Sequence, residues 1–433
     1  MSFFTLGKKE FVATHKFFSE ELADGESKLR GLKDEWAAAV KLLVDFGSGR
    51  GHLDDLLEGS ELSRTRWLVM ETFRQWFIIE GILKPRLRRP PRPVSLNLIR
   101  LALGECMSRP ESEHPKVVHH AVETGGRMGL SKPEKGFVNG VLRQLLREGI
   151  AARKTLAGSH PEWMTRRWHR QFGETGLVRL LEWNQGQPVI HVSADVGPAY
   201  SEDTPWEGFY KVKPSRFGEA LEDLEAGKVY VQDPFARIPV ALLNPAPGET
   251  VLDLCAAPGG KSRLIARRMK EKGNLVLVDK PGKRLDRLRE NVARLGAGEV
   301  RIIGSRIEDL QAGRSGERLE AGTFDAVLID VPCSNTGVMR KRPDVKVRLT
   351  EGALFEQAKE QAQLLRMAAA WVRPGGRLVY STCSLEAEEN DACVEAFLKA
   401  FPTWELKERK MSLPWECGHD GGGAFLLTAP KGA

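Results

Sequence analysis

The chain has 433 residues, of which 41% are hydrophobic and 28% are charged, which is typical of a globular protein with two or three domains. No apolar run approaches the roughly 18 residues that a membrane span needs, and the first residues are too polar for a secretory signal, so we expect a cytoplasmic protein without a membrane contact. A net charge of +7 favours a polyanionic partner, although this indication is weak by itself.

The N-terminal half has apolar residues at helical spacing. Four stretches, residues 67–79, 96–107, 119–128 and 137–146, each place apolar side chains on one face. They predict an all-helical domain over residues 36–154, preceded by a polar extension over residues 1–35. Within this domain, residues 84–93 form a proline-rich strip with five cations, which is either a solvated loop or a loop that contacts phosphates.

Residues 155–235 predict a connector and a small α+β subdomain. Trp163, Trp168 and Phe172 indicate one or two helices. Short strands are expected over residues 189–192, 208–212 and 228–231.

The pattern changes in residues 236–433, where short apolar runs alternate with helical stretches. Strands are expected over residues 251–254, 275–279, 300–303, 326–330 and 377–380. Helices are expected over residues 261–271, 281–295, 353–372 and 387–400. This alternation predicts a parallel sheet covered by helices on both faces, so we expect a multidomain protein with an all-α domain followed by a Rossmann-like α/β domain.

The first strand of this domain continues into Asp253-Leu-Cys-Ala-Ala-Pro-Gly-Gly-Lys-Ser262 and a helix. Ligands bind beyond the carboxyl ends of parallel strands, and Gly259 and Gly260 let the backbone approach a ligand closely. A dinucleotide would need G-x-G-x-x-G, which is absent, and a triphosphate loop would need glycine where Cys255 stands. S-adenosylmethionine fits better, because it has no phosphates and has a ribose that Asp279, at the end of the second strand, can bind.

Two cysteines follow strands at this same edge of the sheet. One strand ends in Asp330-Val-Pro-Cys-Ser334, and the next continues into Ser381-Thr-Cys-Ser384. A lone buried cysteine is usually a small apolar residue, but Cys333 and Cys383 can both reach one ligand site. Methylation of cytosine at carbon 5 needs a thiolate that adds to carbon 6 and so makes carbon 5 nucleophilic. Asp330 can bind the cytosine edge and stabilise protonation at N3, or it can cap the following turn.

The other cysteines and histidines do not indicate a metal site. Six cysteines without a C-x-x-C spacing are typical of reduced thiols, and the nine histidines contain no H-E-x-x-H pattern. His119 and His120 are expected on a helix surface. We therefore expect no metal ion. We also expect a monomer.

Together, these motifs resemble those of RNA cytosine-5 methyltransferases. In that family the Thr-Cys cysteine attacks the base and the Pro-Cys cysteine helps to release the product, which implies Cys383 as nucleophile and Cys333 as its partner. DNA cytosine-5 enzymes attack from the Pro-Cys motif and lack the second one, so both motifs together imply an RNA substrate. The helical half is similar to a NusB-like RNA-binding domain, notably in Gly136-Phe-Val-Asn-Gly-Val-Leu-Arg143. Over residues 36–430, the layout resembles the bacterial 16S rRNA methyltransferase B family.

The resemblance implies S-adenosylmethionine-dependent methylation of carbon 5 of a specific cytosine in 16S ribosomal RNA, through a covalent bond from Cys383 to cytosine carbon 6. The implied catalytic residues are Cys383, Cys333 and Asp330. The implied cofactor contacts lie at the turn and after three strands: Cys255, Ala256, Ala257, Pro258, Gly259, Gly260, Lys261, Asp279, Arg284 and Asp330. Without the resemblance, Arg284 is a surface charge.

The chain departs from the family pattern at three places. After the third strand, Ser305 stands where the family has an aspartate that reads the adenine amine, so Ser305, Glu308 or Asp309 is expected to substitute, or the affinity to be lower. His191-Val-Ser193 replaces a short Arg-Val-Asn strand. Asp420-Gly-Gly-Gly-Ala-Phe425 is a longer version of the family's Asp-Gly-Phe-Phe.

Two other functions are compatible with these residues. The first is a tRNA cytosine-5 methyltransferase, which keeps the fold and cofactor and changes the RNA. The second is a non-catalytic RNA-binding factor in ribosome assembly, for which the Ser305 departure is the motivation. Both cysteines and Asp330 are present, and this favours an enzyme.

Overall fold

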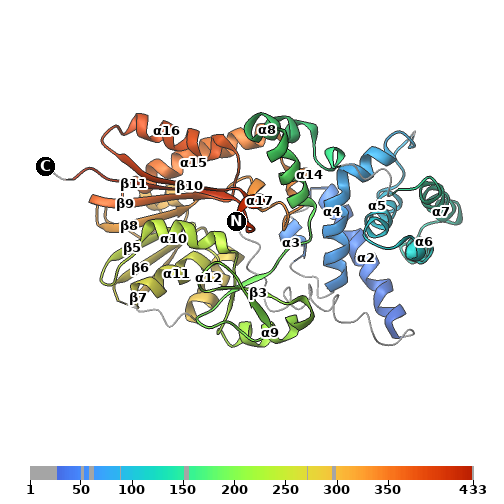
Figure 1. Ribbon diagram of the computed structural model, residues 1–433, viewed down its shortest axis with the longest axis horizontal. Helices are drawn as coiled ribbons and strands as arrows, with labels where there is room; N and C mark the ends of the chain where they lie inside the picture. Colours follow the sequence, from blue (N-terminus) through green and yellow to red (C-terminus); the bar gives the residue numbers. More distant parts are fainter. Residues whose placement is uncertain are drawn as a thin grey trace.

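The computed structural model describes residues 27–49, 53–57, 63–87, 89–150, 156–270, 272–294 and 299–431. A helical domain lies on the right of Figure 1 and an α/β domain on the left, with the connector helix α8 and a small sheet between them. Residues 1–26 of the expected N-terminal extension lie outside the described residues. None of the described helices is both long and apolar enough to cross a membrane.

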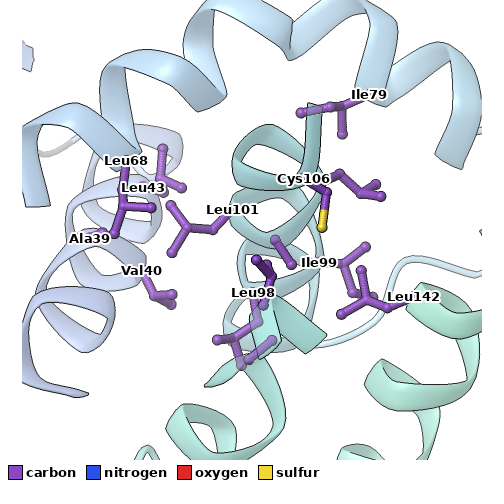
Figure 2. Packing of buried hydrophobic residues seen from close by; sticks show 14 of the residues in the cluster. Ala39, Val40, Leu43, Leu68, Ile79, Leu98, Ile99, Leu101, Cys106 and Leu142 are labelled. Atoms are coloured by element: carbon purple, nitrogen blue, oxygen red, sulfur yellow. The ribbon is translucent and has the colours of Figure 1, made fainter. Parts of the chain in front are cut away.

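The helical domain confirms the predicted all-α half. Its helices are α2 (Ser27–Gly47), α3 (Leu53–Leu57), α4 (Ser63–Leu83), α5 (Pro93–Met107), α6 (His114–Arg127) and α7 (Lys132–Arg147). Helix α5 lies at the centre, because its apolar residues point in several directions. In Figure 2, Leu98 and Leu101 face Val40 on α2, and Ile99 faces Leu142 on α7. The apolar stripes predicted on α4, α6 and α7 are thus the surfaces that pack against α5.

The cationic strip over residues 84–93 connects α4 to α5 at the surface. Arg86 donates to Glu148 at 2.6 Å, and Arg92 lies 3.1 Å from Glu134. These two cations therefore have partners within the protein. Phosphate contact by the strip stays a prediction.

The connector and the small sheet join the two domains. Helix α8 (Glu162–Gln185) bends at Gly173, where φ is +69°, and the sheet has the strand order β2-β3-β1-β4. Its strands are β1 (His191–Ser193), β2 (Ser201–Asp203), β3 (Phe209–Val212) and β4 (Tyr230–Val231). β2 was not predicted from the sequence; it is polar and largely exposed, so it has no apolar pattern.

The α/β domain confirms the predicted Rossmann-like fold. Five strands are parallel and were all predicted: β5 (Thr250–Leu254), β6 (Asn274–Asp279), β7 (Glu299–Gly304), β8 (Phe324–Asp330) and β9 (Val372–Thr382). The helices that cover them include α11 (Gly260–Met269), α12 (Lys283–Ala293), α15 (Glu351–Ala369) and α16 (Asp391–Ala400). The strand order is β10-β11-β9-β8-β5-β6-β7. The order changes direction at β5, so the carboxyl end of β5 is where such sheets bind ligands.

Several elements of this domain were not predicted, among them α10 (Arg237–Leu243) and the antiparallel strands β10 (Glu405–Ser412) and β11 (Gly422–Thr428). β10 forms an edge of the sheet and exposes a run of charged residues, as edge strands commonly do. β11 begins with glycines, which are unusual inside strands. Both features hide a strand from a search for apolar alternation.

One arginine ties the helical domain to the α/β domain. Arg74 on α4 is buried, and its guanidinium donates to the carbonyl oxygens of Asn184, Gly186 and Arg340 at 2.9–3.2 Å. Lys346 is also buried and donates to the carbonyl oxygens of Arg74 and Ser159. Buried carbonyl groups need such donors. The helical domain is therefore held against the loop that leads away from β8.

Candidate active site

The turn after β5 is held in shape by two residues predicted to bind the cofactor. Asp279, at the end of β6, accepts a hydrogen bond from the backbone N–H of Ala257 at 2.8 Å. Arg284 on α12 donates to the carbonyl oxygen of Ala257. Gly259 has φ +104° at the start of α11, where a side chain would be strained. Asp279 is buried, and burial raises the pKa of its carboxyl group despite Arg284 nearby.

A pocket lies against this turn, at the carboxyl end of β5. The predicted site residues in its wall are Cys255, Ala256, Ala257, Pro258, Gly260, Lys261, Asp330 and Cys383. The predicted residues outside its wall are Gly259, Asp279, Arg284, Ser305 and Cys333. The first group surrounds the pocket, and Asp279 and Arg284 support it from behind.

Ser305 lies next to Asp279 rather than in this pocket. Its backbone N–H donates to the carbonyl oxygen of Asp279 at 3.0 Å, and its hydroxyl donates to the carbonyl oxygen of Arg306 at 2.9 Å. The side chain is buried. The hydroxyl is thus already satisfied by the backbone, and a direct adenine contact by Ser305 stays a prediction.

The wall of the pocket is rich in carboxyl groups. In the described part of the chain, four aspartates and one lysine line it: Asp233, Asp253, Asp330, Asp420 and Lys261. Asp253 is buried, its Oδ2 accepts from the Ser262 hydroxyl at 2.6 Å, and its Oδ1 has no partner among the described residues. Burial raises the pKa of Asp253 to about 7. An unpaired buried carboxyl oxygen is costly without a ligand, so the wall offers a hydrogen-bonding group for a polar ligand.

The two motif cysteines meet beside the pocket. Cys333 Sγ lies 2.7 Å from Cys383 Sγ, and Cys383 Sγ lies 3.2 Å from Asn335 Oδ1. The hydrogen bond with Cys333 lowers the pKa of the Cys383 thiol to about 6, although burial opposes this. Burial, together with Cys383, raises the pKa of Cys333 well above its usual value. The two opposite pKa shifts favour Cys383 as the thiolate of the pair and Cys333 as the thiol.

Lys261 and Asp330 form an ion pair in the wall of the pocket. Their Nζ and Oδ2 atoms are 2.6 Å apart, and both side chains are 16% exposed. Burial alone would lower the pKa of Lys261, but the contact with Asp330 raises it above its usual value. Lys261, at the end of the turn after β5, therefore fixes the orientation of the Asp330 carboxylate near Cys383.

The structure adds a buried charge cluster that was not predicted from the sequence. Lys341 contacts both Asp233 and Asp420, the latter at 2.9 Å. Burial opposes ionisation of Asp233, but Lys341 outweighs it and lowers the pKa of Asp233 to about 2. Burial and Asp233 raise the pKa of Asp420 to about 8. The only sequence signal was Pro234 after Asp233, which marks a helix start: Asp233 does accept from the N–H of Phe235.

The small sheet also reaches the pocket, which was not predicted. Tyr230 and Gln232 lie in its wall. A Cβ atom on Gly260 would lie 2.7 Å from the Gln232 amide nitrogen, so the Gln232 side chain would have to shift. Glycine at this position lets the small sheet approach the turn closely.

The extended glycine run after Asp420 also has a steric reason. A Cβ atom on Gly422 would lie 2.3 Å from the carbonyl oxygen of Thr382, and one on Gly337 would lie 2.3 Å from the carbonyl oxygen of Gly421. The strand start and the loop after β8 thus pass close to the segment that carries Cys383. Among the described residues, no group of three or more His, Cys, Asp or Glu side chains is placed to hold a metal ion.

Two sequence families match the chain. Residues 240–423 match the family described as 16S rRNA methyltransferase RsmB/F, and residues 34–147 match the NusB family. The chain is 32% identical over 402 residues to a probable ribosomal RNA small subunit methyltransferase B of Bacillus subtilis, covering 85% of this chain and 88% of that protein. It is 31% identical to the ribosomal RNA small subunit methyltransferase B of Klebsiella pneumoniae, covering 86% and 90%.

Solved structures have the same fold. The crystal structure of the protein PH0851 superposes with a TM-score of 0.72 at 22% identity, covering 91% of this chain and 98% of that chain. NSun6 from Pyrococcus horikoshii superposes with a TM-score of 0.55 at 19% identity, covering 63% of this chain and 99% of that chain. These likenesses show the fold alone.

Proposed function

Since the chain belongs to the ribosomal RNA small subunit methyltransferase B family, we propose that it methylates carbon 5 of one cytosine in 16S ribosomal RNA through a covalent intermediate on Cys383. The chain is an RNA methyltransferase of the RsmB/F type and uses S-adenosylmethionine. The base, the carbon atom and the covalent step are the proposed part.

The observation that carries the proposal is the contact between the two thiols at the pocket wall. A methyltransferase that modifies an oxygen or an exocyclic nitrogen has no need of a thiolate. Cytosine carbon 5 is a poor nucleophile and needs one. Cys383 has a lowered pKa, a thiol donor at 2.7 Å, and a place in the wall of the same pocket as Lys261 and Asp330.

Each side chain then has a defined task. The Cys383 thiolate adds to carbon 6 of the base, and the electron pair moves towards N3 and makes carbon 5 nucleophilic. Asp330, fixed by Lys261, binds the N3 edge of cytosine and stabilises its protonation. S-adenosylmethionine, when bound, supplies an electrophilic methyl group. Carbon 5 takes this methyl group and then loses its proton to solvent water. The electron pair of that C–H bond restores the ring double bond and expels Cys383, and the Cys333 thiol stabilises the leaving thiolate by donating a hydrogen bond to it.

The proposed cofactor residues fall into two groups. The turn residues Cys255 to Lys261 form the wall against which the cofactor lies, and Asp330 closes it. We assign Asp279 and Arg284 to the ribose end, and their contacts with Ala257 on the turn after β5 support this assignment. Ser305 follows the neighbouring strand and is assigned to the adenine end.

We further propose that four segments divide the work. Residues 1–35 are an extension, residues 36–154 bind RNA, residues 155–235 link the domains and residues 236–433 carry out methyl transfer. The match of residues 34–147 to the NusB family supports the second assignment. The burial of Arg74 between domains supports a fixed placement of the RNA-binding half relative to the pocket.

Methyl transfer to defined RNAs tests the proposal. The protein is incubated with methyl-labelled S-adenosylmethionine and, separately, with under-methylated 16S ribosomal RNA, 23S ribosomal RNA and tRNA, and 5-methylcytosine is then mapped. We expect label at one cytosine of 16S RNA. Label in tRNA alone would show that the chain is a tRNA methyltransferase. Label on an atom other than carbon 5 would exclude the thiol mechanism. Absence of label in every RNA would exclude the methyltransferase activity.

Asp279→Asn is expected to weaken binding of S-adenosylhomocysteine about 10- to 100-fold, because a ribose hydroxyl then loses a charged acceptor. Asparagine can still accept from the Ala257 N–H, so the turn should keep its shape. Isothermal titration calorimetry gives the Kd. Asp286→Asn, an exposed acid on α12, is the matched control and should bind normally. An unchanged Kd for Asp279→Asn would exclude the ribose assignment.

A further inference from the structure

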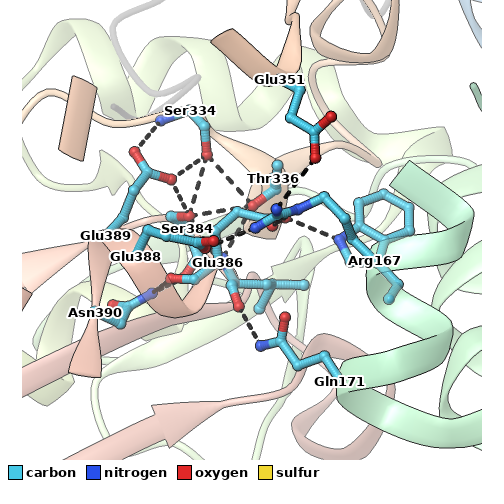
Figure 3. Close-up of polar contacts among 12 residues, drawn as sticks. Arg167, Gln171, Ser334, Thr336, Glu351, Ser384, Glu386, Glu388, Glu389 and Asn390 are labelled. Atoms are coloured by element: carbon cyan, nitrogen blue, oxygen red, sulfur yellow. Dashed lines mark hydrogen bonds and ion pairs between the residues drawn. The ribbon is translucent and has the colours of Figure 1, made fainter. Parts of the chain in front are cut away.

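A fully buried glutamate lies behind the two thiols. Glu389 is 0% exposed and ends a short helical turn after β9. Its Oε1 accepts from the backbone N–H of Ser334 and from the side-chain amide of Gln361, both at 2.8 Å. Its Oε2 accepts from the hydroxyls of Ser334 and Ser384. Figure 3 shows the two serines converging on this one carboxylate.

These contacts join the two segments that carry the thiols. Ser334 directly follows Cys333, and Ser384 directly follows Cys383. The two serine hydroxyls also lie 3.1 Å from each other. Gln361 reaches the other side of Cys333 by donating to the carbonyl oxygen of Pro332 at 2.8 Å. Backbone hydrogen bonds from Val331 to Ser381 and from Gly337 to Cys383, both at 3.0 Å, also join these two loops. Glu389 adds the side-chain bridge directly behind the two cysteines.

The loop that contains Glu389 is in turn held by the connector helix α8. Arg167 pairs with Glu386 at 3.1 Å and with Glu388 at 2.6 Å. Gln171 donates to the carbonyl oxygen of Leu385 at 2.7 Å. Figure 3 shows these side chains reaching the loop from the side opposite Glu389. The loop after Cys383 is thus fixed from both sides.

We propose that Glu389 is a positioning residue that sets the distance between the Cys333 and Cys383 sulfur atoms by holding the two loops that carry them. The inference rests on the proposed function for the meaning of that distance. A carboxylate suits this position because the four surrounding groups are all hydrogen-bond donors, and a carboxylate can accept all four hydrogen bonds. When this bridge is lost, the sulfur atoms separate and Cys383 loses the donor that favours its thiolate.

The test compares Glu389→Ala with Glu389→Gln. Alanine removes every acceptor. Glutamine keeps a carbonyl oxygen that can accept from the two N–H donors, Ser334 N–H and the Gln361 amide. Its own amide group can donate to the two serine hydroxyls, because each hydroxyl can rotate and accept. Positioning therefore predicts a damaged alanine variant and a nearly normal glutamine variant. A role for the negative charge predicts that both variants are equally damaged.

Two measurements are made on the full-length protein. The first is the pH dependence of Cys383 alkylation by iodoacetamide, followed by peptide mass spectrometry. Among the described residues, the titratable groups that face Cys383 are Cys333, Asp330 and Lys261, and those near Glu389 include Tyr380, Glu386 and Cys393. The second measurement is methylation, with kcat and KM for S-adenosylmethionine determined separately.

For Glu389→Ala we expect the alkylation midpoint to rise from about 6 by about one unit or more. We also expect kcat to fall about 100-fold while KM for S-adenosylmethionine changes less than about 3-fold. Glu389→Gln should keep the midpoint and lose less than about 5-fold in kcat. Glu395→Gln, which replaces an exposed glutamate on α16, is the matched control and should behave as the unmodified protein.

Ser384→Ala gives a second route if Glu389→Ala does not fold, because it removes only one of the four hydrogen bonds. It should raise the midpoint in the same direction by a smaller amount. A folded Glu389→Ala or Ser384→Ala variant with an unchanged midpoint would overturn the proposal, as would a glutamine variant as inactive as the alanine variant. Alkylation needs no RNA, so failure of the proposed function would appear as absent methylation with the midpoint shift intact.

Discussion

Replacing Cys383 with alanine is expected to reduce RNA methylation by roughly 10⁴-fold or more, because the thiolate that adds to carbon 6 is then missing. Cys255 is the other cysteine among the described residues of the pocket wall, and burial raises the pKa of its thiol well above the usual value, so it does not replace Cys383. Cys383→Ser should be equally inactive, since a hydroxyl at this position stays protonated at neutral pH. The measurement is single-turnover methyl transfer to 16S ribosomal RNA with the protein in excess. Binding of S-adenosylhomocysteine should be nearly unchanged in both variants.

The control for this substitution is Cys417→Ala, which removes a half-buried thiol outside the pocket wall and should leave the rate unchanged.

The pH dependence of methylation by the unmodified protein gives a second check. Since the pKa of Cys383 is lowered to about 6, the thiolate is fully present above this pH and is lost as the pH falls through it. Methylation should therefore be insensitive to this group above about pH 7 and decline below pH 6. A Cys383→Ala variant with more than a few per cent of normal activity would exclude the covalent mechanism.

Replacing Cys333 with alanine is expected to trap the protein on its RNA. Without the Cys333 thiol, the departing Cys383 sulfur loses its hydrogen-bond donor, so release of the product slows more than addition to the base. We expect the covalent fraction to rise about tenfold or more, visible as a band of low mobility in a denaturing gel. The assay is run near pH 8.5, because loss of the donor also raises the pKa of Cys383.

The doubly substituted variant Cys333→Ala/Cys383→Ala is the control for the trapped complex and should show no adduct. Peptide mapping of the adduct should place the nucleotide on Cys383. If an adduct forms instead with Cys383→Ala alone and maps to Cys333, the two roles are reversed. If neither single variant forms an adduct, Cys333 does not take part in release.

Much of the fold could be read from the sequence, because its helices and parallel strands have strong apolar periodicity. The five parallel strands and four of the helices that cover the sheet were predicted, although β9 begins at Val372 rather than at residue 377. Strands β10 and β11 were missed, since one is a charged edge strand and the other begins with glycines. Periodicity reports burial of one face, and these two strands lack that signal.

The candidate site divides in the same way. The turn 255–261, Asp330 and Cys383 could be predicted to share a pocket, because residues after neighbouring parallel strands meet at one edge, and the structure places them together. Their roles in catalysis and cofactor binding stay predictions. Asp233, Lys341 and the bridge through Glu389 could not be predicted, because each joins segments far apart in the chain.

By itself, then, the sequence determined the fold class, the edge of the sheet where the candidate site lies, and several of the residues in that site. These follow from local periodicity and from motifs that lie directly after strands. Only the tertiary structure decided that Cys333 lies 2.7 Å from Cys383 and that Arg74 holds the helical domain in place. Distances between segments and the burial that shifts a pKa depend on how whole elements pack, which the sequence around one residue does not contain.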